Sequence, residues 1–284
     1  MAVGRIWTWW QGAWHDGNVA VLGAADHGTW QGSVVFDGAR AFEGTAPDLD
    51  LHCARAIQSA ERMGLVPPMD AATLTAIAQE GIDRTPPGTA LYVRPMLWAT
   101  RGGASLVAPD PDSTAVCVCL EERPMVEPRG LKLCNTRFRR PTYDCAPTDM
   151  KAGCLYPNNA RMLREAFARG YDNAVSLDAL GNLAETATSN LFLVHDGVVR
   201  TPAANGTFLA GITRNRIMQL MRDDGWTVDE AVLTLDDLAS ADEVFTTGNA
   251  NKVLPIVRYE DRDYQEGPAA RRARELYWAY AHAA

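Results

Sequence analysis

Lysine is scarce in this sequence of 284 residues, which has three lysines, Lys132, Lys151 and Lys252, against 24 arginines. A reaction that needs an amine nucleophile therefore has few candidates. Cys-x-x-Cys and His-x-x-x-His pairs are also missing, so the common zinc-ligand spacings are excluded and no metal is expected. Neither a Gly-x-Gly-x-x-Gly motif nor a P-loop is present, so no nucleotide held by such a loop is expected.

Long apolar runs are missing as well. No run reaches the roughly 18 to 20 residues of a membrane span, and the first residues lack the apolar centre of a signal peptide. The net charge is −8 with acidic and basic residues interleaved, which argues against a surface for nucleic acid or anionic membranes. The six cysteines show no ligand or disulfide pattern and are expected to be reduced and mostly buried. We expect a cytoplasmic protein.

Apolar periodicity and turn residues predict an α+β (mixed α/β) fold in two unequal lobes, with mainly antiparallel sheets and flanking helices. A polar segment with prolines, residues 123–130, is the expected interdomain linker. It separates a small N-terminal α/β domain, 1–122, from a large C-terminal domain, 131–284. Strands are expected at 5–14, 19–22, 34–36, 91–98, 115–120, 131–138, 174–177, 190–194, 243–247 and 253–257, and helices at 48–65, 69–81, 157–169, 212–224 and from 268 onward.

Lys151 stands in Asp-Met-Lys-Ala-Gly-Cys-Leu-Tyr, residues 149–156, just before a predicted helix. Small and apolar neighbours hydrate an ammonium poorly, which favours the neutral amine and makes Lys151 a candidate Schiff-base nucleophile. A lysine in such a segment, taken alone, is more often a solvated loop residue. Lys132 lacks comparable neighbours, and Lys252, beside a Gly-Asn-Ala-Asn turn, is a reserve candidate.

Two further segments carry groups that suit a charged ligand. Glu185 is a lone carboxylate among small side chains in Gly-Asn-Leu-Ala-Glu-Thr-Ala-Thr-Ser-Asn, residues 181–190, and suits a cation in a crowded site. Taken alone, it could be an ordinary strand-end residue. Residues 205–214, Asn-Gly-Thr-Phe-Leu-Ala-Gly-Ile-Thr-Arg, open into a predicted helix whose first N–H groups could bind phosphate. The alternative is a plain loop with Thr213 as a helix cap.

In this order and spacing, the segments resemble the fold-type-IV family of pyridoxal-phosphate enzymes. The resemblance extends upstream to Gly-Ser-Val-Val-Phe-Asp-Gly-Ala-Arg at 32–40, His-Cys-Ala-Arg at 52–55 and Tyr-Val-Arg-Pro at 92–95, so it covers nearly the whole chain. The family includes branched-chain aminotransferases, D-amino-acid aminotransferases, (R)-amine transaminases and aminodeoxychorismate lyase. Each segment is weak evidence by itself, but the combination is specific.

The resemblance implies pyridoxal 5′-phosphate as cofactor, held mainly by the large domain. Lys151 would bind its aldehyde and move the substrate proton. Glu185 would pair with the pyridine nitrogen and keep it protonated, which lets the ring accept electrons. Tyr156 would share a proton with the phenolate oxygen. The other implied contacts are Arg55 and the N–H groups of Ile212 and Thr213 at the phosphate, Leu209 on the ring, and the Gly248-Asn249-Ala250 turn beside the phosphate and the substrate carboxylate.

For the substrate, Tyr92 and Arg94 resemble the L-branched-chain pattern, in which the tyrosine helps hold the carboxylate and the arginine meets the distal carboxylate of glutamate or 2-oxoglutarate. Two positions depart from it. Gln31 stands where a tyrosine is usual, and Gly-Asn-Ala-Asn-Lys at 248–252 replaces Gly-Thr-Ala-Ala-Glu. The pocket is expected to include Gln31, Phe36 and Ala250, with a second carboxylate contact from Arg40, Arg101, Arg137, Arg139 or Arg140.

The resulting hypothesis is an aminotransferase, a homodimer or higher homo-oligomer, that moves an amino group from a branched-chain L-amino acid to 2-oxoglutarate by a ping-pong cycle. Its partners would be small amino and 2-oxo acids, not nucleic acid or membranes. A D-amino-acid or (R)-amine transaminase is the alternative, and aminodeoxychorismate lyase is a third. A cofactor-binding protein without turnover is opposed by the intact set of Lys151, Tyr156 and Glu185.

Overall fold

A computed structural model describes residues 4–283, and the chain divides into two compact units. The N-terminal unit comprises residues up to Met125 together with Asp149–Cys154, and the C-terminal unit comprises Val126–Thr148 and Leu155–Ala284. The expected domain limits placed residues 149–154, and with them Lys151, in the large C-terminal domain. In the structure this short segment belongs to the N-terminal unit instead.

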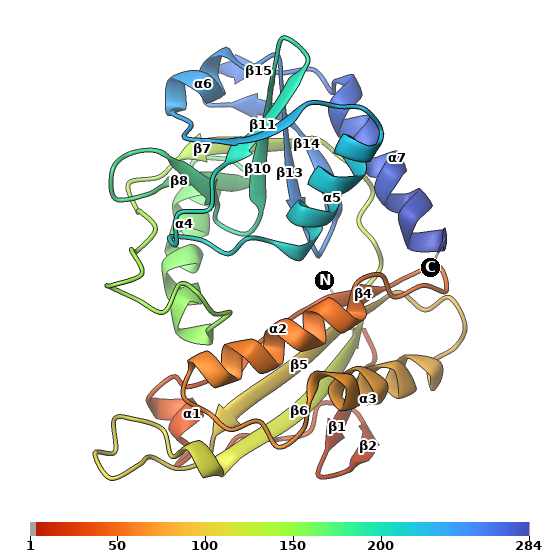
Figure 1. The fold of residues 1–284 in the computed structure, drawn as a ribbon, viewed down its shortest axis with the longest axis vertical. Helices are drawn as coiled ribbons and strands as arrows, with labels where there is room; N and C mark the ends of the chain where they lie inside the picture. Colours follow the sequence, from red (N-terminus) through yellow and green to blue (C-terminus); the bar gives the residue numbers. More distant parts are fainter. Residues whose placement is uncertain (1–3, 284) are drawn as a thin grey trace. The chain divides into compact units, whose positions relative to one another are not determined.

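The N-terminal unit is built on a six-stranded antiparallel sheet in the order β2-β1-β6-β5-β3, with β4 also paired to β5. Helices α2 and α3 pack side by side and against this sheet (Figure 1). The elements are β1 (Ile6–Trp10), β2 (Ala13–Asp16), α1 (His27–Trp30), β3 (Val35–Phe36), β4 (Ala39–Ala41), α2 (Leu49–Arg62), α3 (Ala71–Asp83), β5 (Leu91–Ala99), η1 (Pro111–Ser113) and β6 (Thr114–Glu122).

Two elements of this unit position the residues of interest. Along β5, alternate residues such as Leu91 and Val93 are fully buried, so Tyr92 and Arg94 project from the opposite face of the strand. Helix α2 buries one apolar stripe that includes Cys53 and Ala56. The helix ends just before Gly64, whose φ of 80° favours a residue without a Cβ.

The C-terminal unit is built on a nine-stranded sheet in the order β12-β11-β10-β13-β14-β7-β8-β9, with β15 paired to β14. Three neighbouring pairs, β11–β12, β14–β7 and β7–β8, are parallel, and the others are antiparallel. The elements are β7 (Leu131–Asn135), η2 (Gly153–Leu155, which begins in the N-terminal unit), α4 (Tyr156–Ala168), β8 (Asn173–Leu177), β9 (Leu183–Thr186), β10 (Asn190–His195), β11 (Val198–Pro202), α5 (Ile212–Asp223), β12 (Val228–Ala231), α6 (Leu235–Ser240), β13 (Glu243–Gly248), β14 (Lys252–Tyr259), β15 (Arg262–Asp263) and α7 (Pro268–Ala283).

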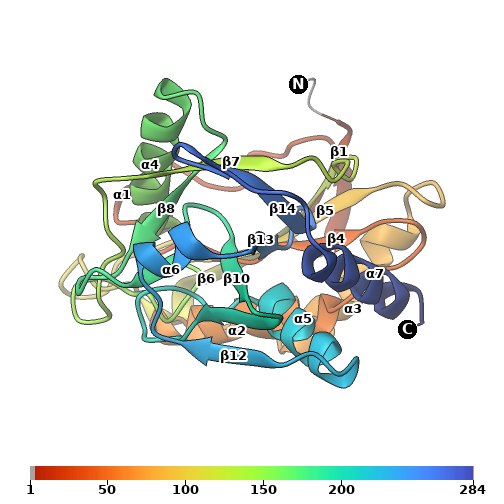
Figure 2. The same cartoon turned by 90° about the horizontal axis from the view of Figure 1, so that it is seen from above.

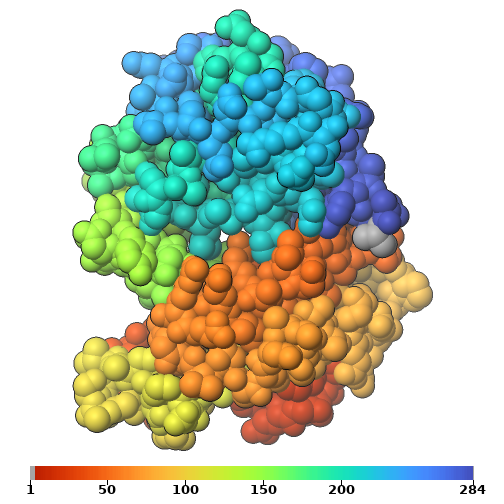
Figure 3. Space-filling model, viewed as in Figure 1, coloured from red at the N-terminus to blue at the C-terminus, as the bar shows by residue number. Residues whose placement is uncertain are grey.

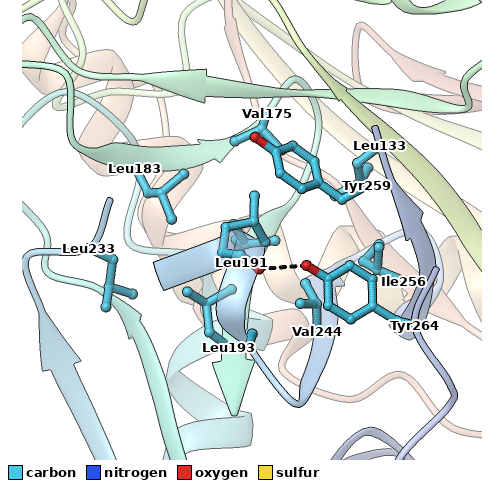
Figure 4. Packing of buried hydrophobic residues seen from close by; sticks show 12 residues of the cluster. Leu133, Val175, Leu183, Leu191, Leu193, Leu233, Val244, Ile256, Tyr259 and Tyr264 are labelled. Carbon is cyan, nitrogen blue, oxygen red and sulfur yellow. Dashed lines mark hydrogen bonds between the residues drawn. The ribbon is translucent and has the colours of Figure 1, made fainter. Parts of the chain in front are cut away.

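One apolar cluster of the C-terminal unit joins β7, β8, β9, β10, β13 and β14 (Figure 4). Leu191, Leu193 and Val244 are fully buried at its centre. The Tyr264 hydroxyl donates a hydrogen bond of 2.5 Å to the Leu238 carbonyl at its edge, so this buried phenol is satisfied. Because β9 and β10 share this core, the residues that they carry are held in fixed positions.

Three helices pack against the sheet of the C-terminal unit. Helix α4 packs on β7 and β8, whereas α5 and α7 contact each other and also β13 (Figures 1 and 2). A buried side chain of β13 binds the start of α7. The Glu243 carboxylate accepts hydrogen bonds from the N–H groups of Ala269, at 3.0 Å, and Ala270, at 2.6 Å. Burial raises the pKa of Glu243.

The expected α+β fold is confirmed, and its long helices and most strands lie within a few residues of their predicted positions. Residues 19–22 form no strand, and β7 ends at Asn135 rather than at residue 138. The short elements β4, β9, β12 and α6 were not predicted. Three of the six cysteines are buried and Cys119 is half-buried, as expected, whereas Cys145 and Cys154 are exposed. None of the helices within residues 4–283 is long and apolar enough to cross a membrane.

We predict that Glu243→Ala lowers the free energy of unfolding by about 1–3 kcal/mol, because two buried N–H groups at the start of α7 lose their acceptor. Urea denaturation followed by circular dichroism measures the change. Glu266→Ala, an exposed residue just before the same helix, is the control and should change stability by less than about 0.5 kcal/mol. Equal losses in the two variants would contradict the prediction.

Candidate active site

Lys151 lies on a short segment of the N-terminal unit that pairs with β3. The Phe36 N–H donates to the Lys151 carbonyl at 3.1 Å, and the Lys151 N–H donates to Ser59 Oγ of α2 at 3.1 Å. Next to it, Val35 and Ala152 form an antiparallel bridge. The half-buried Lys151 side chain therefore starts from a fixed backbone, and its Nζ lies 5.0 Å from the centroid of the Phe36 ring.

Behind this segment, Asp37 is fully buried and binds two cationic or ionisable side chains of α2. Arg55 Nε and Nη2 lie 2.6 and 2.9 Å from its two carboxylate oxygens, and His52 Nδ1 lies 2.7 Å from Oδ1. Burial alone would raise the pKa of Asp37, but Arg55 and His52 hold it well below its usual range. Since the Arg55 side chain is still 18% exposed, it combines a structural ion pair with a solvent-facing edge.

Tyr92 and Arg94 lie side by side on β5. The Arg94 guanidinium carbon is 5.0 Å from the centroid of the Tyr92 ring, and Nη2 is 3.3 Å from Glu121 Oε2. The Tyr92 hydroxyl reaches the β3–β4 turn so closely that a Cβ on Gly38 would lie 2.1 Å from its oxygen. Glycine at position 38 is therefore what allows the tyrosine to adopt this position.

Arg40 is the cross-strand neighbour of Tyr92 and is 1% exposed. Its Nη2 donates to the Arg123 carbonyl at 2.6 Å, and its Nε contacts Met125 Sδ at 3.2 Å. Burial lowers the pKa of Arg40 to about 10. Two donors of this arginine, which was expected to contact the substrate, are thus bound within the N-terminal unit.

In the C-terminal unit, Glu185 of β9 is a buried carboxylate with two neighbours of fixed position. Arg140 Nη2 lies 3.1 Å from Oε1, and Asn190 Nδ2 donates to Oε2 at 3.2 Å. Arg140 is itself buried and donates to Asn159 Oδ1 at 2.6 Å and to the Thr207 carbonyl at 3.2 Å. This arrangement holds both carboxylate oxygens and limits their rotation.

Asn190 also connects Glu185 to the loop before α5, because Nδ2 donates to the Leu209 carbonyl at 3.2 Å. The approach is close, since a Cβ on Gly211 would lie 2.2 Å from Asn190 Oδ1. Gly211 precedes α5 without a side-chain cap, and the first N–H groups of the helix, those of Ile212 and Thr213, have no carbonyl partner one turn back. The structure therefore brings Glu185, Leu209 and the start of α5 together.

The turn after β13 holds a second group of polar atoms. Asn249 Oδ1 accepts a hydrogen bond of 2.8 Å from Lys252 Nζ, and Lys252 is 1% exposed. Asn249 Nδ2 and Thr247 Oγ1 are buried and have no hydrogen-bond partner in the part of the chain that the structure describes. Buried polar atoms normally have partners, so both are candidates for ligand contacts.

The other expected residues lie at the surface or serve other contacts. Tyr156 at the start of α4, Gln31 at the end of α1 and Ala250 are exposed. Three of the five arginines proposed for a carboxylate contact are engaged elsewhere, with Arg101 on Asp110, Arg137 over Phe138 and Arg139 on the Asp178 carbonyl. Within residues 4–283, no group of three His, Cys, Asp or Glu side chains is arranged for a metal ion.

Sequence reasoning missed several residues that support the site. Arg140 was one of five candidates for a carboxylate contact with the substrate, but in the structure it pairs with Glu185. Asp37, Ser59, Asn190 and Thr247 were not singled out as functional. Asn190 lies in the motif that contains Glu185, so its position five residues away was a usable signal. Nothing local to Arg140 indicated its partner.

The chain is similar along most of its length to a known family and to several known proteins. The family model described as amino-transferase class IV matches residues 34–259. An aminotransferase from Brucella abortus bound to the cofactor PLP is 52% identical with a TM-score of 0.97, covering 98% of this chain and 99% of that one. A branched-chain amino acid aminotransferase from T.th., complexed with N-(5′-phosphopyridoxyl)-L-glutamate, is 30% identical with a TM-score of 0.90, covering 100% and 95%. The branched-chain-amino-acid aminotransferase of Pseudomonas aeruginosa is 30% identical over 93% of this chain and 88% of its own.

We predict that Asp37→Asn lowers the free energy of unfolding at neutral pH by about 3–5 kcal/mol, because Arg55 and His52 lose a buried carboxylate. The depressed pKa means that the stabilisation is complete above the unfolded-state value of about 4 and is lost as the pH falls further. The difference between wild type and variant should therefore shrink in acid. Urea denaturation between about pH 7 and pH 3 tests this, with the exposed Asp112→Asn as control. A pH-independent difference would contradict it.

Proposed function

The chain belongs to the class IV aminotransferases, and we propose that it moves the amino group of a branched-chain L-amino acid to 2-oxoglutarate, with pyridoxal 5′-phosphate as cofactor. The relatives named branched-chain-amino-acid aminotransferases and the neighbour with bound phosphopyridoxyl-L-glutamate support this pair of substrates. The observation that carries the proposal is the buried Glu185 carboxylate, which Arg140 and Asn190 hold next to the loop that opens into α5.

The donor set fits this cofactor. An aldehyde needs a primary amine, which Lys151 offers, and a protonated pyridine nitrogen needs an anionic acceptor, which Glu185 offers. A phosphate needs N–H donors, which the uncapped start of α5 and the Asn249 amide supply. When bound, pyridoxal phosphate supplies a carbonyl that takes up the amino group and a ring that stabilises negative charge at the substrate Cα.

Lys151 is proposed to hold the cofactor and then to carry the proton between the substrate Cα and the cofactor carbon. Proton transfer needs a base that is held at a fixed distance and direction from the carbon. The two hydrogen bonds that the Lys151 backbone makes with Phe36 and Ser59 support such a fixed position. The Phe36 ring limits hydration of the amine on one side. Tyr156 is proposed to donate to the phenolate oxygen of the cofactor.

Glu185 is proposed to hold the proton on the pyridine nitrogen. Because Arg140 and Asn190 fix both carboxylate oxygens, little reorganisation is needed when charge develops on the ring. Arg55, the N–H groups of Ile212 and Thr213, and Asn249 are proposed to bind the phosphate, and Leu209 is proposed to pack on the ring.

The substrate contacts are proposed to come from the face of β5 that carries Tyr92 and Arg94. Tyr92 would hold the α-carboxylate, and Arg94 would meet the distal carboxylate of glutamate or 2-oxoglutarate through a charge-assisted hydrogen bond. Arg40 would support Tyr92 from the neighbouring strand, since its Nε and Nη2 donors are engaged within the N-terminal unit. Gln31, Phe36 and Ala250 are proposed to line the rest of the pocket.

A homodimer in the cytoplasm is also proposed. A loop of the N-terminal unit, residues 101–110, stands out in yellow in Figure 3 and carries Leu106 and Val107, exposed by 61% and 69%. His27 Nε2 lies 2.9 Å from the Val107 carbonyl, which ties this loop to α1 and its 55% exposed Trp30. Such an apolar group suits a second copy of the chain. Sedimentation of an active monomer would refute the dimer.

The proposal of a cytoplasmic location rests on the cysteines. All six lie within the described residues and are free, as is usual in a reducing compartment.

We predict that the purified enzyme with L-leucine or L-valine loses its visible cofactor absorbance and regains it with 2-oxoglutarate. Lys151→Ala should lose both the lysine-linked absorbance band and turnover, because the other two lysines do not take its place. Lys132→Ala is the matched control and should behave like wild type, since Lys132 is exposed. A response to D-alanine or (R)-1-phenylethylamine but not to L-leucine would contradict the proposed substrate.

We predict that Arg94→Ala separates the two half-reactions. Loss of a charge-assisted hydrogen bond costs about 1.5–3 kcal/mol, so kcat/KM for 2-oxoglutarate should fall about 10- to 150-fold. The half-reaction with L-leucine should change little, because leucine has no distal carboxylate. Single-turnover kinetics measure each half separately, and Arg101→Ala, another arginine paired with an acidic residue in the N-terminal unit, is the control. Equal losses in both halves would show that Arg94 supports the fold instead.

A further inference from the structure

Lys252 is a buried lysine at the start of β14, with an exposed fraction of 1% and a positive φ of 62°. Its Nζ lies 2.8 Å from Asn249 Oδ1 and 5.2 Å from the centroid of the Tyr277 ring on α7, which is itself fully buried. A buried ammonium is costly unless acceptors and a ring face compensate for lost hydration. The amide oxygen of Asn249 is therefore committed to Lys252.

The hydrogen bond from Lys252 to Asn249 Oδ1 fixes the direction of the Asn249 NH2 group. With Oδ1 turned toward the ammonium, Nδ2 points the other way, and a flipped amide would place its N–H groups against the N–H groups of Lys252. Nδ2 is buried and has no hydrogen-bond partner in the described part of the chain. A buried donor without a partner is unfavourable, so the arrangement suits a ligand that accepts hydrogen bonds.

A second polar atom lies two residues before Asn249, near the end of β13. Thr247 is 1% exposed, and its Oγ1 also has no partner among residues 4–283. Thr247 lies in β13 and Asn249 in the turn that follows it, so both unpaired polar atoms come from the same end of this strand. The Thr247 hydroxyl and the Asn249 amide can both donate hydrogen bonds, and the Lys252 ammonium lies on the other side of that amide. This combination suits an anion with several oxygens.

We propose that Lys252 is a positioning residue for the cofactor phosphate: it orients Asn249 so that the amide N–H donors face the phosphate and it places a positive charge behind them. The inference rests on the proposed function. It also connects two of the three departures of residues 248–252 from Gly-Thr-Ala-Ala-Glu, because asparagine in place of threonine at position 249 and lysine in place of glutamate at position 252 act as one pair.

The test compares two ligands on the full-length chain after removal of cofactor. Pyridoxal 5′-phosphate and pyridoxal share the aldehyde and the ring, but only the former has the phosphate. We expect Lys252→Met to weaken pyridoxal phosphate about ten-fold, the low end for a hydrogen bond to a charged group, with pyridoxal unchanged. Lys132→Met, an exposed lysine in the same unit, should change neither affinity.

A double-mutant cycle tests whether Lys252 acts through Asn249. Asn249→Ala should also weaken pyridoxal phosphate selectively, and adding Lys252→Met should cost little more. Replacing the pair together by Asn249→Thr and Lys252→Glu should recover much of the lost affinity compared with Lys252→Glu alone. Additive losses, or equal losses for both ligands, would overturn the proposal.

The result remains decisive if Lys252→Met does not fold. Asn249→Ala leaves the lysine in place, and an unchanged preference for pyridoxal phosphate over pyridoxal in that variant would overturn the inference. Failure of the proposed function looks different, because the wild type would then bind neither ligand on Lys151 or would not transaminate L-leucine. A wild type that is active and an Asn249→Ala variant that keeps the preference would refute only the role of this pair.

Discussion

The contact on which the proposed chemistry depends most is the buried Glu185 carboxylate between Arg140 and Asn190. A carboxylate taken out of water is stable only when charged or polar donors replace its hydration. Arg140 meets this need while bound to Asn159 and the Thr207 carbonyl, and Asn190 does so while bound to Leu209. The proposed cofactor chemistry is thus coupled, through one acidic side chain, to the packing of the segment that carries Arg140 and of the loop before α5.

The N-terminal unit shows the same principle with a different acid. Asp37 joins β3 to α2 through Arg55 and His52, and the same helix holds Lys151 in place through Ser59. In both units a buried carboxylate fixes residues that come from separate elements. Positions that face a ligand are therefore set by the core beneath them rather than by the loops that carry them.

The helices and long strands could be predicted because their apolar periodicity is strong and their ends carry turn residues, as at Gly64. The short strands β4, β9 and β12 are too brief for a periodic signal. The match of motifs predicted Lys151, Glu185 and the start of α5 as site residues, but no local pattern could place residues 149–154 beside β3 or pair Arg140 with Glu185. The exchange at Asn249 and Lys252 was visible in the sequence, whereas the burial of the lysine was not.

The burial of Lys252 has a practical consequence for chemical labelling. Of the three lysine side chains, one is exposed, one is half-buried and one is sealed in the core, so amine reagents can distinguish them by rate. Lys132 should react quickly, and Lys252 should react only when the chain unfolds locally. The rate at Lys151 should depend on how much of it carries the proposed cofactor. Mass spectrometry of the labelled chain could thus report on the folded state and on the site in a single measurement.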